Sequence, residues 1–413
     1  GHGAGESLTT GGSNVAIGSA AFANCSTTSY NTAVGFEALN DNTTGASNTA
    51  VGSYALDANS TASYNTAVGS SALGGTTTGD NNVAIGNNAL YTNVGNGGNV
   101  AIGVNALTTS NGGYYNTAVG YQAGDELTTG ISSTFIGRGA GHSVTTGHYN
   151  VCIGDLAGGE ITTGSTNTAV GFQAGDAATT VSNNTAVGAY AMTADTAGSN
   201  TAVGANALAA NTTGNNDAFG VNAMITNTTG TQNVGIGASA GYSNSTGHYN
   251  TSLGNGAVYY ISTGTYNTSI GRATNQETTT GSYNVCIGTS TKPSGAGGSS
   301  ELVLGNVLTG AGANTFAFGS TAVGRVYNSF ATNASWTRDS DERLKTNIKD
   351  DTLGLSFIDS LRTVTFQWKP NNEIPETFDA YQETNAKDTT TVIHGMIAQE
   401  VKTALNSAGV NTF

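Results

Sequence analysis

The sequence has little of what an ordinary globular domain uses. Of its 413 residues only 9% are charged, and it holds three prolines and three cysteines. Three cysteines cannot build a disulfide framework. The scarcity of Lys and Arg and the net charge of −14 argue against nucleic-acid binding, which depends on neutralised phosphates. No run of 18 apolar residues occurs, so no membrane-spanning helix and no membrane insertion are expected.

Glycine is abundant instead, with 60 residues, alongside many Asn, Thr, Ser and Ala. Such a composition is also typical of disordered linkers. Here, however, Val, Ile, Leu and Ala recur at fixed positions, and this regularity favours an ordered repeat.

A five-residue block, Asn-Thr-Ala-Val-Gly or Asn-Val-Ala-Ile-Gly, recurs through most of the chain. Its glycines follow one another in steps of 17 residues, apart from two steps of 16. They are Gly18, Gly35, Gly52, Gly69, Gly86, Gly103, Gly120, Gly137, Gly154, Gly171, Gly188, Gly204, Gly220, Gly237, Gly254, Gly271, Gly288 and Gly305. Eighteen marked coils at nearly one spacing indicate a stacked repeat architecture.

Each unit predicts the same local structure. Thr49-Ala50-Val51 alternates outward and inward like a short strand. The following Gly52 is expected to take a backbone conformation that other residues resist and so to turn a corner. Ala55-Leu56 reads as a second inward segment, and Thr-Thr-Gly, where it occurs, as a closing turn. The sequence therefore predicts a mainly β protein, an elongated β-solenoid or β-roll.

The polar and sulfur residues of the block have structural interpretations. Asparagines that open successive blocks, stacked at about 4.8 Å, can form a hydrogen-bonded ladder; a row of ligand-binding asparagines is the alternative. Cys152 and Cys286 stand where Ala is usual, so we expect small buried hydrophobes. Cys25 is a lone loop residue without an assigned role. No metal or cofactor site is predicted.

A single coil cannot be stable alone. It buries only a few small apolar side chains, worth a few kcal/mol at about 0.8 kcal/mol per methylene, whereas ordering 17 residues costs on the order of 25 kcal/mol. Neighbouring coils must supply the difference. Because the core is thin, we also expect packing against other copies of the chain, most simply as a homotrimer.

The character of the sequence changes after Gly305. From Arg338 onward 20 of 76 residues are charged, against 18 in the first 337. We therefore expect a repeat fibre over 1–305, a transition segment over 306–339 and an α+β domain over 340–413. Within that domain, residues 353–361 and 398–405 have helical patterns and residues 363–369 alternate like a strand.

Two parts of the chain resemble known families. The repeat block over 14–305 resembles the head repeats of trimeric autotransporter adhesins, whose repeat is usually shorter, and repeats of phage tail fibres. The C-terminal sequence resembles the peptidase S74 intramolecular chaperone domain of phage tail fibres and tailspikes. The residues that carry this second resemblance are Ser340-Asp341-Glu342-Arg343-Leu344-Lys345-Thr346-Asn347-Ile348, Leu361-Arg362, Phe366-Gln367-Trp368-Lys369 and His394-Gly395-Met396-Ile397-Ala398-Gln399-Glu400-Val401.

On physical grounds alone, Ser340 reads as the N-cap of a helix. The S74 resemblance implies a further role: the domain drives trimerisation and then releases itself by cutting the Asp339–Ser340 bond. Ser340 would be the nucleophile and Lys345 the general base, its pKa lowered by burial in the assembled trimer. For His394 a structural role at a strand-to-helix corner is favoured over catalysis. The only enzymatic activity implied is this single self-cleavage.

The sequence thus predicts a trimeric phage tail fibre for host-surface attachment, located in the virion tail or outside the cell. Its partners would be its own copies, a host receptor, with polysaccharide as one candidate, and other tail proteins. A bacterial trimeric adhesin or another extracellular fibre is the alternative. Ice binding is disfavoured, because it needs a flat Thr-x-Thr array and the Thr pairs here adjoin Gly in turns.

Overall fold

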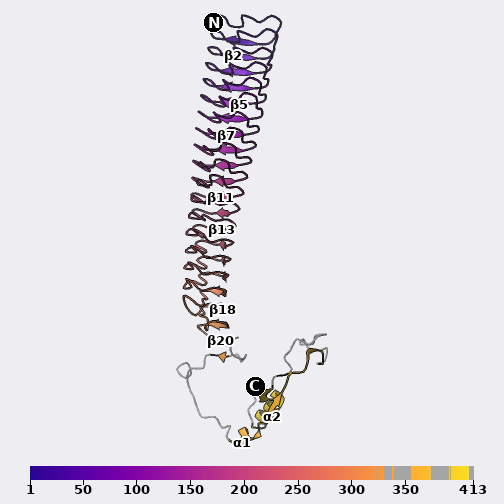
Figure 1. Ribbon diagram of the computed structural model, residues 1–413, viewed down its shortest axis with the longest axis vertical. Coiled ribbons are helices and arrows are strands. Elements are labelled where there is room, and N and C mark those ends of the chain that lie inside the picture. Colours follow the sequence, from indigo (N-terminus) through magenta and orange to yellow (C-terminus); the bar gives the residue numbers. More distant parts are fainter. Residues whose placement is uncertain (323, 330–336, 339–354, 374–389, 391, 409–413) are drawn as a thin grey trace. The chain divides into compact units, whose positions relative to one another are not determined.

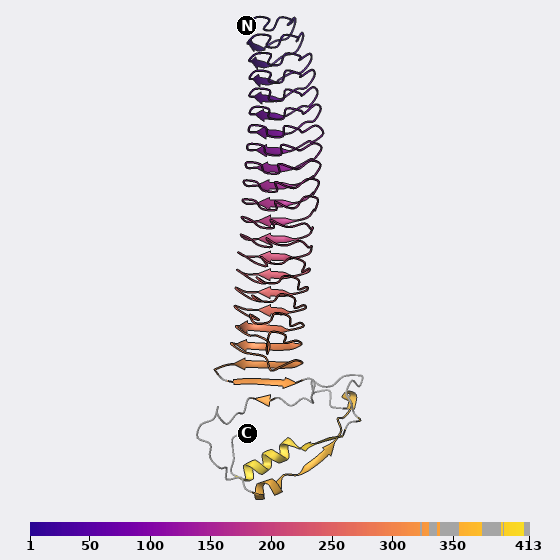
Figure 2. The same cartoon turned by 60° about the vertical axis from the view of Figure 1, so that its left-hand side comes forward.

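The computed structural model describes residues 1–322, 324–329, 337–338, 355–373, 390 and 392–408. The chain divides into two compact units, Gly1–Asp339 and Ser340–Phe413, and each is described separately. The first unit is a stack of coils that follow one another along the chain from the N-terminus, with one strand on the same side of every coil (Figures 1 and 2). The predicted mainly β solenoid is confirmed.

Sixteen of the strands are three residues long and stand at one position of the repeat. They are β1 (Val15–Ile17), β2 (Thr32–Val34), β3 (Thr49–Val51), β4 (Thr66–Val68), β5 (Val83–Ile85), β6 (Val100–Ile102), β7 (Thr117–Val119), β8 (Thr134–Ile136), β9 (Val151–Ile153), β10 (Thr168–Val170), β11 (Thr185–Val187), β12 (Thr201–Val203), β13 (Asp217–Phe219), β14 (Val234–Ile236), β15 (Thr251–Leu253) and β16 (Thr268–Ile270). Four longer strands follow, β17 (Val285–Thr289), β18 (Glu301–Asn306), β19 (Thr315–Ser320) and β20 (Gly324–Ser329), and then the two-residue β21 (Thr337–Arg338).

Every strand from β1 to β18 pairs in parallel with the strand of the next coil, and equivalent residues face each other. Ala50, for example, stands opposite Ala67, and the two 16-residue steps keep this register, with Ala186 opposite Ala202. A last parallel step of 14 residues sets Gly305 opposite Gly319. β20 then pairs antiparallel to β19. The parallel stack thus continues one coil beyond residue 305.

The block glycines meet two constraints at once. Gly52 has φ of 144°, in the region that favours glycine. A Cβ at this position would also collide with the backbone carbonyl of Gly69 in the next coil. The predicted special backbone conformation is therefore confirmed, and close stacking of consecutive coils is a second reason for glycine.

The asparagine ladder forms, but chiefly between side chain and backbone rather than between amides. The side-chain oxygen of Asn48 accepts a hydrogen bond from the backbone N–H of Asn65 at 3.0 Å, and its Nδ2 donates to the carbonyl of Ala62 at 2.8 Å. Each buried asparagine thereby satisfies two backbone groups of the next coil. The ladder residues are interior, so the alternative of a surface row of ligands is excluded for these positions.

The core is built from the middle strand residue, usually Ala, and from two positions on the opposite side of the coil, four and seven residues after the block glycine. In the coils of Leu90 and Leu107 the first position is leucine and the second is a buried polar residue, Asn93 or Ser110. Because equivalent positions stack, the core is a set of parallel columns.

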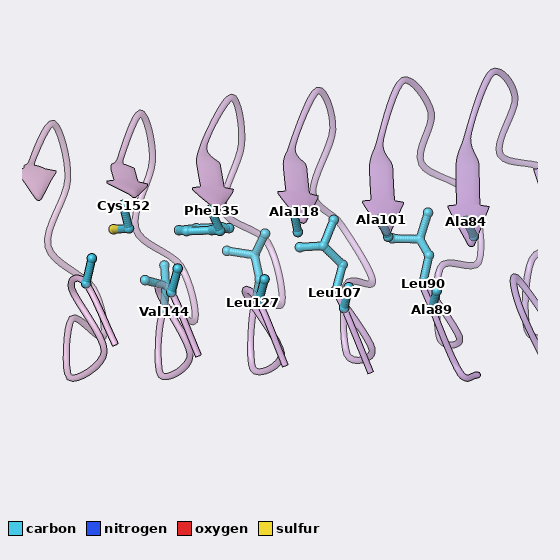
Figure 3. Close-up of a cluster of buried hydrophobic side chains, with 14 of the residues drawn as sticks. Ala84, Ala89, Leu90, Ala101, Leu107, Ala118, Leu127, Phe135, Val144 and Cys152 are labelled. Atoms are coloured by element: carbon cyan, nitrogen blue, oxygen red, sulfur yellow. The ribbon is translucent and has the colours of Figure 1, made fainter. Parts of the chain in front are cut away.

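Four consecutive coils exchange these two core positions. Gly124, Gly141, Gly158 and Gly175 replace the leucine, and Leu127, Val144, Ile161 and Ala178 replace the polar residue. In the same region Phe135 replaces the strand alanine; a Cβ at Gly124 would lie 2.7 Å from its ring. Figure 3 shows the change from Leu90 and Leu107 to Leu127 and Val144 beneath Phe135. In three of these coils a larger residue at the second position, and Phe135 in the strand, offset the missing leucine, whereas the coil of Gly175 and Ala178 has only small residues at both positions.

Asp195 is the one carboxylate in this second core column, which elsewhere holds Asn at 42, 59, 93, 211, 227 and 244. It is fully buried and accepts hydrogen bonds from the backbone N–H of Ala197 (3.2 Å), from Nδ2 of Asn200 (3.2 Å) and from Nδ2 of Asn211 (3.1 Å). Burial raises the pKa of Asp195 to about 6, against the lowering effect of these donors.

We expect Asp195→Asn to stabilise the solenoid at neutral pH. Since the folded-state pKa lies above the unfolded value of 3.8, the folded state holds the proton more tightly, and stability is lost as pH rises from about 4 through about 6. The variant should be more stable by on the order of 2 kcal/mol at pH 7 and no more stable below pH 4. Thermal unfolding of both proteins between pH 4 and 8 measures this; an equal gain at every pH would contradict it.

Glu301 ends the asparagine ladder. Its backbone N–H donates to the side chain of Asn284 at 3.1 Å, like a ladder asparagine. Its buried carboxylate then accepts from the backbone N–H of Ser294 at 3.1 Å and from the Ser294 hydroxyl at 2.6 Å. A longer acidic side chain thus replaces Asn where the loops lengthen and the coil shape changes.

The second unit contains α1 (Leu355–Ser360), β22 (Thr363–Phe366), the 3₁₀ helix η2 (Asn371–Glu373), β23 (Ile393–Met396) and α2 (Ala398–Ser407). β22 and β23 form an antiparallel pair with Thr363 opposite Met396. The predicted helix, strand and helix near residues 353–361, 363–369 and 398–405 are confirmed, with boundaries that differ by a few residues.

Candidate functional site

The predicted cleavage site lies outside the described residues. Asp339, Ser340 and Lys345 all fall in the segment 339–354, so the roles assigned to them remain predictions. The two later motifs of the S74 resemblance lie in the described part of the second unit.

These two motifs are brought together by strand pairing and by an ion pair. β22 ends at Phe366, the first residue of the Phe366–Lys369 motif, and β23 carries His394, which stands opposite Thr365. Just outside the strands, the Arg362 guanidinium binds the Glu400 carboxylate through two nitrogens, at 3.1 and 2.5 Å. This contact raises the pKa of Arg362 and lowers that of Glu400. Residues separated by 38 positions are thereby joined, as a shared domain requires.

His394 itself is exposed and lies within β23, four residues before the start of α2. The neighbouring motif residues also form local contacts. Nε2 of Gln367 donates to the carbonyl of Thr390 at 2.8 Å, and the rings of Phe366 and Trp368 meet edge to face at 5.4 Å. The motifs thus act as structural elements of the strand pair.

Among its described residues, the second unit has no buried side chain. Large apolar residues stay exposed, namely Ile358, Trp368, Val392, Met396 and Ile397. A domain that exposes apolar side chains on both its helix and its strands has surface for contact with further protein.

A second candidate surface runs along the solenoid on the outward face of the strands. The middle strand residue points into the core and the two flanking residues point outward, so the third residue, Val or Ile in most coils, is partly exposed. Ile85 and Ile102 are 39% and 36% exposed, and Phe318 of the last parallel strand is 40% exposed. In-register pairing aligns these side chains into one row, the strand-face row, whose members are the third residues of β1 to β16 together with Ile287, Leu304 and Phe318.

Exposed aromatic residues form a third set of surface features. Tyr249, Tyr266 and Tyr283 occupy equivalent positions in three consecutive coils and stack with centroids 4.6 and 5.0 Å apart. Tyr242 and Tyr259 form another stack at 4.7 Å. Their sequence signal was present, since each precedes the next by 17 residues, but only the stacking of coils brings their rings together.

Two of the loop histidines accept a hydrogen bond from a backbone N–H of the preceding coil, a role that the sequence alone did not indicate. We call the residues at this repeat position the capping column. Nδ1 of His148 accepts from the backbone N–H of Ile131 at 3.1 Å, and Nδ1 of His248 accepts from that of Thr231 at 3.0 Å. Serine or aspartate does the same in other coils, as Asp80 does for Ser63 at 2.7 Å. The third, His142, lies 3.9 Å from carboxylate oxygens of Asp125 and Glu126.

The described residues hold no cluster of three or more His, Cys, Asp and Glu placed to bind a metal. All three cysteines are free and buried, and burial raises the pKa of Cys152 and of Cys286 to about 12. The interpretation of these two as buried hydrophobes is confirmed. In the part of the chain that the structure describes, no helix has the length and apolarity needed to span a bilayer.

In sequence order, the described structure is thus a repeat β-solenoid followed by a small domain with a strand pair and a helix. Residues 340–410 match the family model Peptidase_S74, chaperone of endosialidase. A search of curated proteins finds no match. The chaperone domain and the solenoid together fit a phage tail fibre or tailspike with an intramolecular chaperone, and they point to a protein of the virion tail or the extracellular space.

Proposed function

We propose that this chain is a trimeric phage tail fibre that attaches to the host surface and is assembled, then released, by its C-terminal domain. The observation that carries the proposal is the match of residues 340–410 to the chaperone family. The solenoid, whose coils stack in register, is the fibre segment that such a chaperone would assemble.

The position of the proposed cut agrees with the division of the chain. The family match begins at Ser340, and the two compact units are Gly1–Asp339 and Ser340–Phe413. Cleavage of the Asp339–Ser340 bond would therefore separate the fibre from the chaperone without cutting either unit.

The strand-face row is the surface on which we place the contacts between copies. It is apolar and continuous over the solenoid, and charged residues make up only 9% of the sequence. A long row of exposed apolar side chains marks a surface for contact with further protein. A second copy presents the same row with the same spacing, and so can cover it coil by coil.

Double substitution of Ile85 and Ile102 by Glu is expected to abolish the trimer. Each carboxylate would have to be desolvated between copies, which costs several kcal/mol per site, while in the monomer both side chains stay in water. The mass of the full chain in solution, by light scattering, measures the result. As a control, Tyr64→Ser alters an exposed side chain outside the strands and should leave the mass unchanged. A wild-type chain of monomeric mass would refute the proposed assembly.

A further inference from the structure

One coil of the solenoid differs from every other in the two residues immediately before its ladder asparagine, here called the outer pair. In that coil the outer pair is Gly97-Gly98, and no other coil has glycine at both positions. The outer pairs of the adjacent coils are Asp80-Asn81 and Tyr114-Tyr115.

Backbone hydrogen bonds fix the order of these three coils. The N–H of Gly98 donates to the carbonyl of Asp80 at 3.1 Å, and the N–H of Tyr115 donates to that of Gly97 at 3.4 Å. Without a side chain at Gly98 the Tyr115 ring approaches the Gly98 backbone so closely that a Cβ there would lie 2.7 Å from the ring. An open gap remains beside it, bordered by Asp80 and Asn81 on one side and by the two phenol rings on the other.

The gap is a cavity of about 450 Å³, which we call the Gly97–Gly98 slot. It is lined by Thr78, Asp80, Asn81, Gly95, Gly97, Gly98, Tyr114 and Tyr115. Its size falls within the range of small-molecule sites. Adjacent coils lie about 4.8 Å apart, so the backbones at Asp80 and Tyr115, two coils apart, are separated by about 9.6 Å.

The aromatic wall is accessible. Tyr115 is 71% exposed and Tyr114 44% exposed, with ring centroids 6.3 Å apart and planes tilted by 56°. In the Tyr249–Tyr266–Tyr283 column, by contrast, each ring is covered by the next at 4.6 to 5.0 Å. Tyr115 has no tyrosine on either side of it in its column, since the neighbouring residues are Gly98 and Ser132.

The polar wall selects the charge of a ligand. Asp80 is exposed, its Oδ1 accepts the backbone N–H of Ser63 at 2.7 Å, and no Lys or Arg lines the slot. A carboxylate in a chain of net charge −14 repels anionic ligands. The hydrogen bond from Ser63 already satisfies part of the Asp80 carboxylate, and Thr78 and Asn81 add neutral polar groups to the slot. A ligand with hydroxyl donors therefore matches this wall better than a bare cation does.

We propose that the Gly97–Gly98 slot binds one neutral pyranose residue of a polysaccharide. The apolar C–H face of the sugar would lie on Tyr115, and its hydroxyls would bind Asp80, Asn81 and Thr78. Uronic and sialic acids are excluded by Asp80. The inference rests on the proposed attachment role and gives it a ligand class; three copies per fibre would strengthen binding to a repeating polymer.

The solenoid itself offers substitutions that its own coils already tolerate. Gly98→Tyr fills the slot with the residue found at this position in seven other coils, among them Tyr64 and Tyr149, also at positive φ. The end of the Tyr115 side chain, 2.7 Å from the position of the new Cβ, has to turn aside in this variant. Tyr115→Ser copies Ser132, and Asp80→Ser copies Ser63, which accepts a backbone N–H in the same capping column. Tyr64→Ser removes an exposed tyrosine away from the slot and is the matched control.

Binding is tested on the full chain by saturation-transfer NMR, with the methyl glycosides of glucose, galactose, mannose and N-acetylglucosamine as probes. We expect saturable binding of at least one of them. Affinity should fall at least about ten-fold, the worth of one hydrogen bond to a charged group, in Tyr115→Ser and Asp80→Ser. Gly98→Tyr should abolish binding, and Tyr64→Ser should bind like the wild type.

Three results would overturn the slot: binding of none of the four glycosides, equal binding by all variants, or stronger binding of glucuronic acid, sialic acid or choline. If Gly98→Tyr fails to fold by circular dichroism, the two serine variants decide the outcome. A trimer that binds no neutral sugar removes the slot and leaves the fibre function. A monomer that binds sugar removes the trimeric fibre and leaves the slot.

Discussion

Substituting Ser340 by Ala should leave the chain as a single full-length species, whereas the wild type should yield one fragment that ends at Asp339 and one that begins at Ser340. Without the hydroxyl there is no nucleophile to attack the Asp339 carbonyl, so the rate of cleavage should fall by more than about a thousand-fold. Intact-mass spectrometry of the protein purified from its expression host measures both products.

Lys345→Arg tests whether Lys345 acts as a general base or only through its positive charge. Arginine keeps the charge but does not release its proton in proteins, so this variant should also remain uncut. Lys349→Arg, in the same segment and outside the proposed pair, is the control and should be cut normally. If the wild type, like Ser340→Ala, is found only as the full-length chain, the proposed self-cleavage is wrong for this chain, while the solenoid and the family match stand.

Gly103→Ala is expected to be among the most destabilising single substitutions in the solenoid. Gly103 has φ of 140°, and a Cβ there would strike the carbonyl group of Gly120 in the next coil. Those two glycines must stay close, because the N–H of Gly120 donates to the carbonyl of Ile102 at 2.8 Å. Backbone strain and loss of this contact together should cost more than about 3 kcal/mol.

The cost of Gly103→Ala should appear locally first, since each coil contacts mainly its neighbours. Amide hydrogen exchange in the coils of Gly103 and Gly120 should therefore speed up before the melting temperature of distant coils changes. Gly12→Ala is the matched control: it has no heavy atom within 4 Å of the added Cβ and no positive φ. Equal amide exchange rates in both variants would show that a Cβ placed against the carbonyl of Gly120 does not destabilise these coils.

The features that repeat were predictable from the sequence because periodicity reveals them directly. The coil length, the inward alanine with Cys152 and Cys286 in its place, the asparagine ladder and the corner glycine all follow from residues at a constant spacing. Since side chains alternate along a strand, the inward alanine also implies that Val and Ile point outward. Their alignment into one exposed row follows only from the register in which the coils stack.

Features that depend on two positions at once also lay beyond the sequence. The exchange of Leu107 and Ser110 for Gly124 and Leu127 keeps the core filled, but it becomes visible only when both columns are known to line one interior. The Gly97–Gly98 slot is similar, because its walls come from three coils. At the cleavage site the limit is different: Ser340 and Lys345 were assigned by family resemblance, and physical reasoning alone gave Ser340 only the role of a helix cap.

Because equivalent residues of successive coils pair in register, the solenoid can gain or lose whole repeats without disturbing its strand pairing. Deleting or duplicating a 17-residue segment joins two equivalent backbone positions, so every downstream strand still meets its partner, and the rod becomes shorter or longer by about 4.8 Å. The two core arrangements restrict where this is tolerated. Recombination among the coils that contain Leu56 to Leu107, or among those that contain Gly124 to Gly175, preserves the packing of the core. At the existing junction the side chains of Leu107 and Phe135 both pack against Gly124. A junction formed between other coils would lack this fit, so whole repeats are gained or lost most easily within one arrangement.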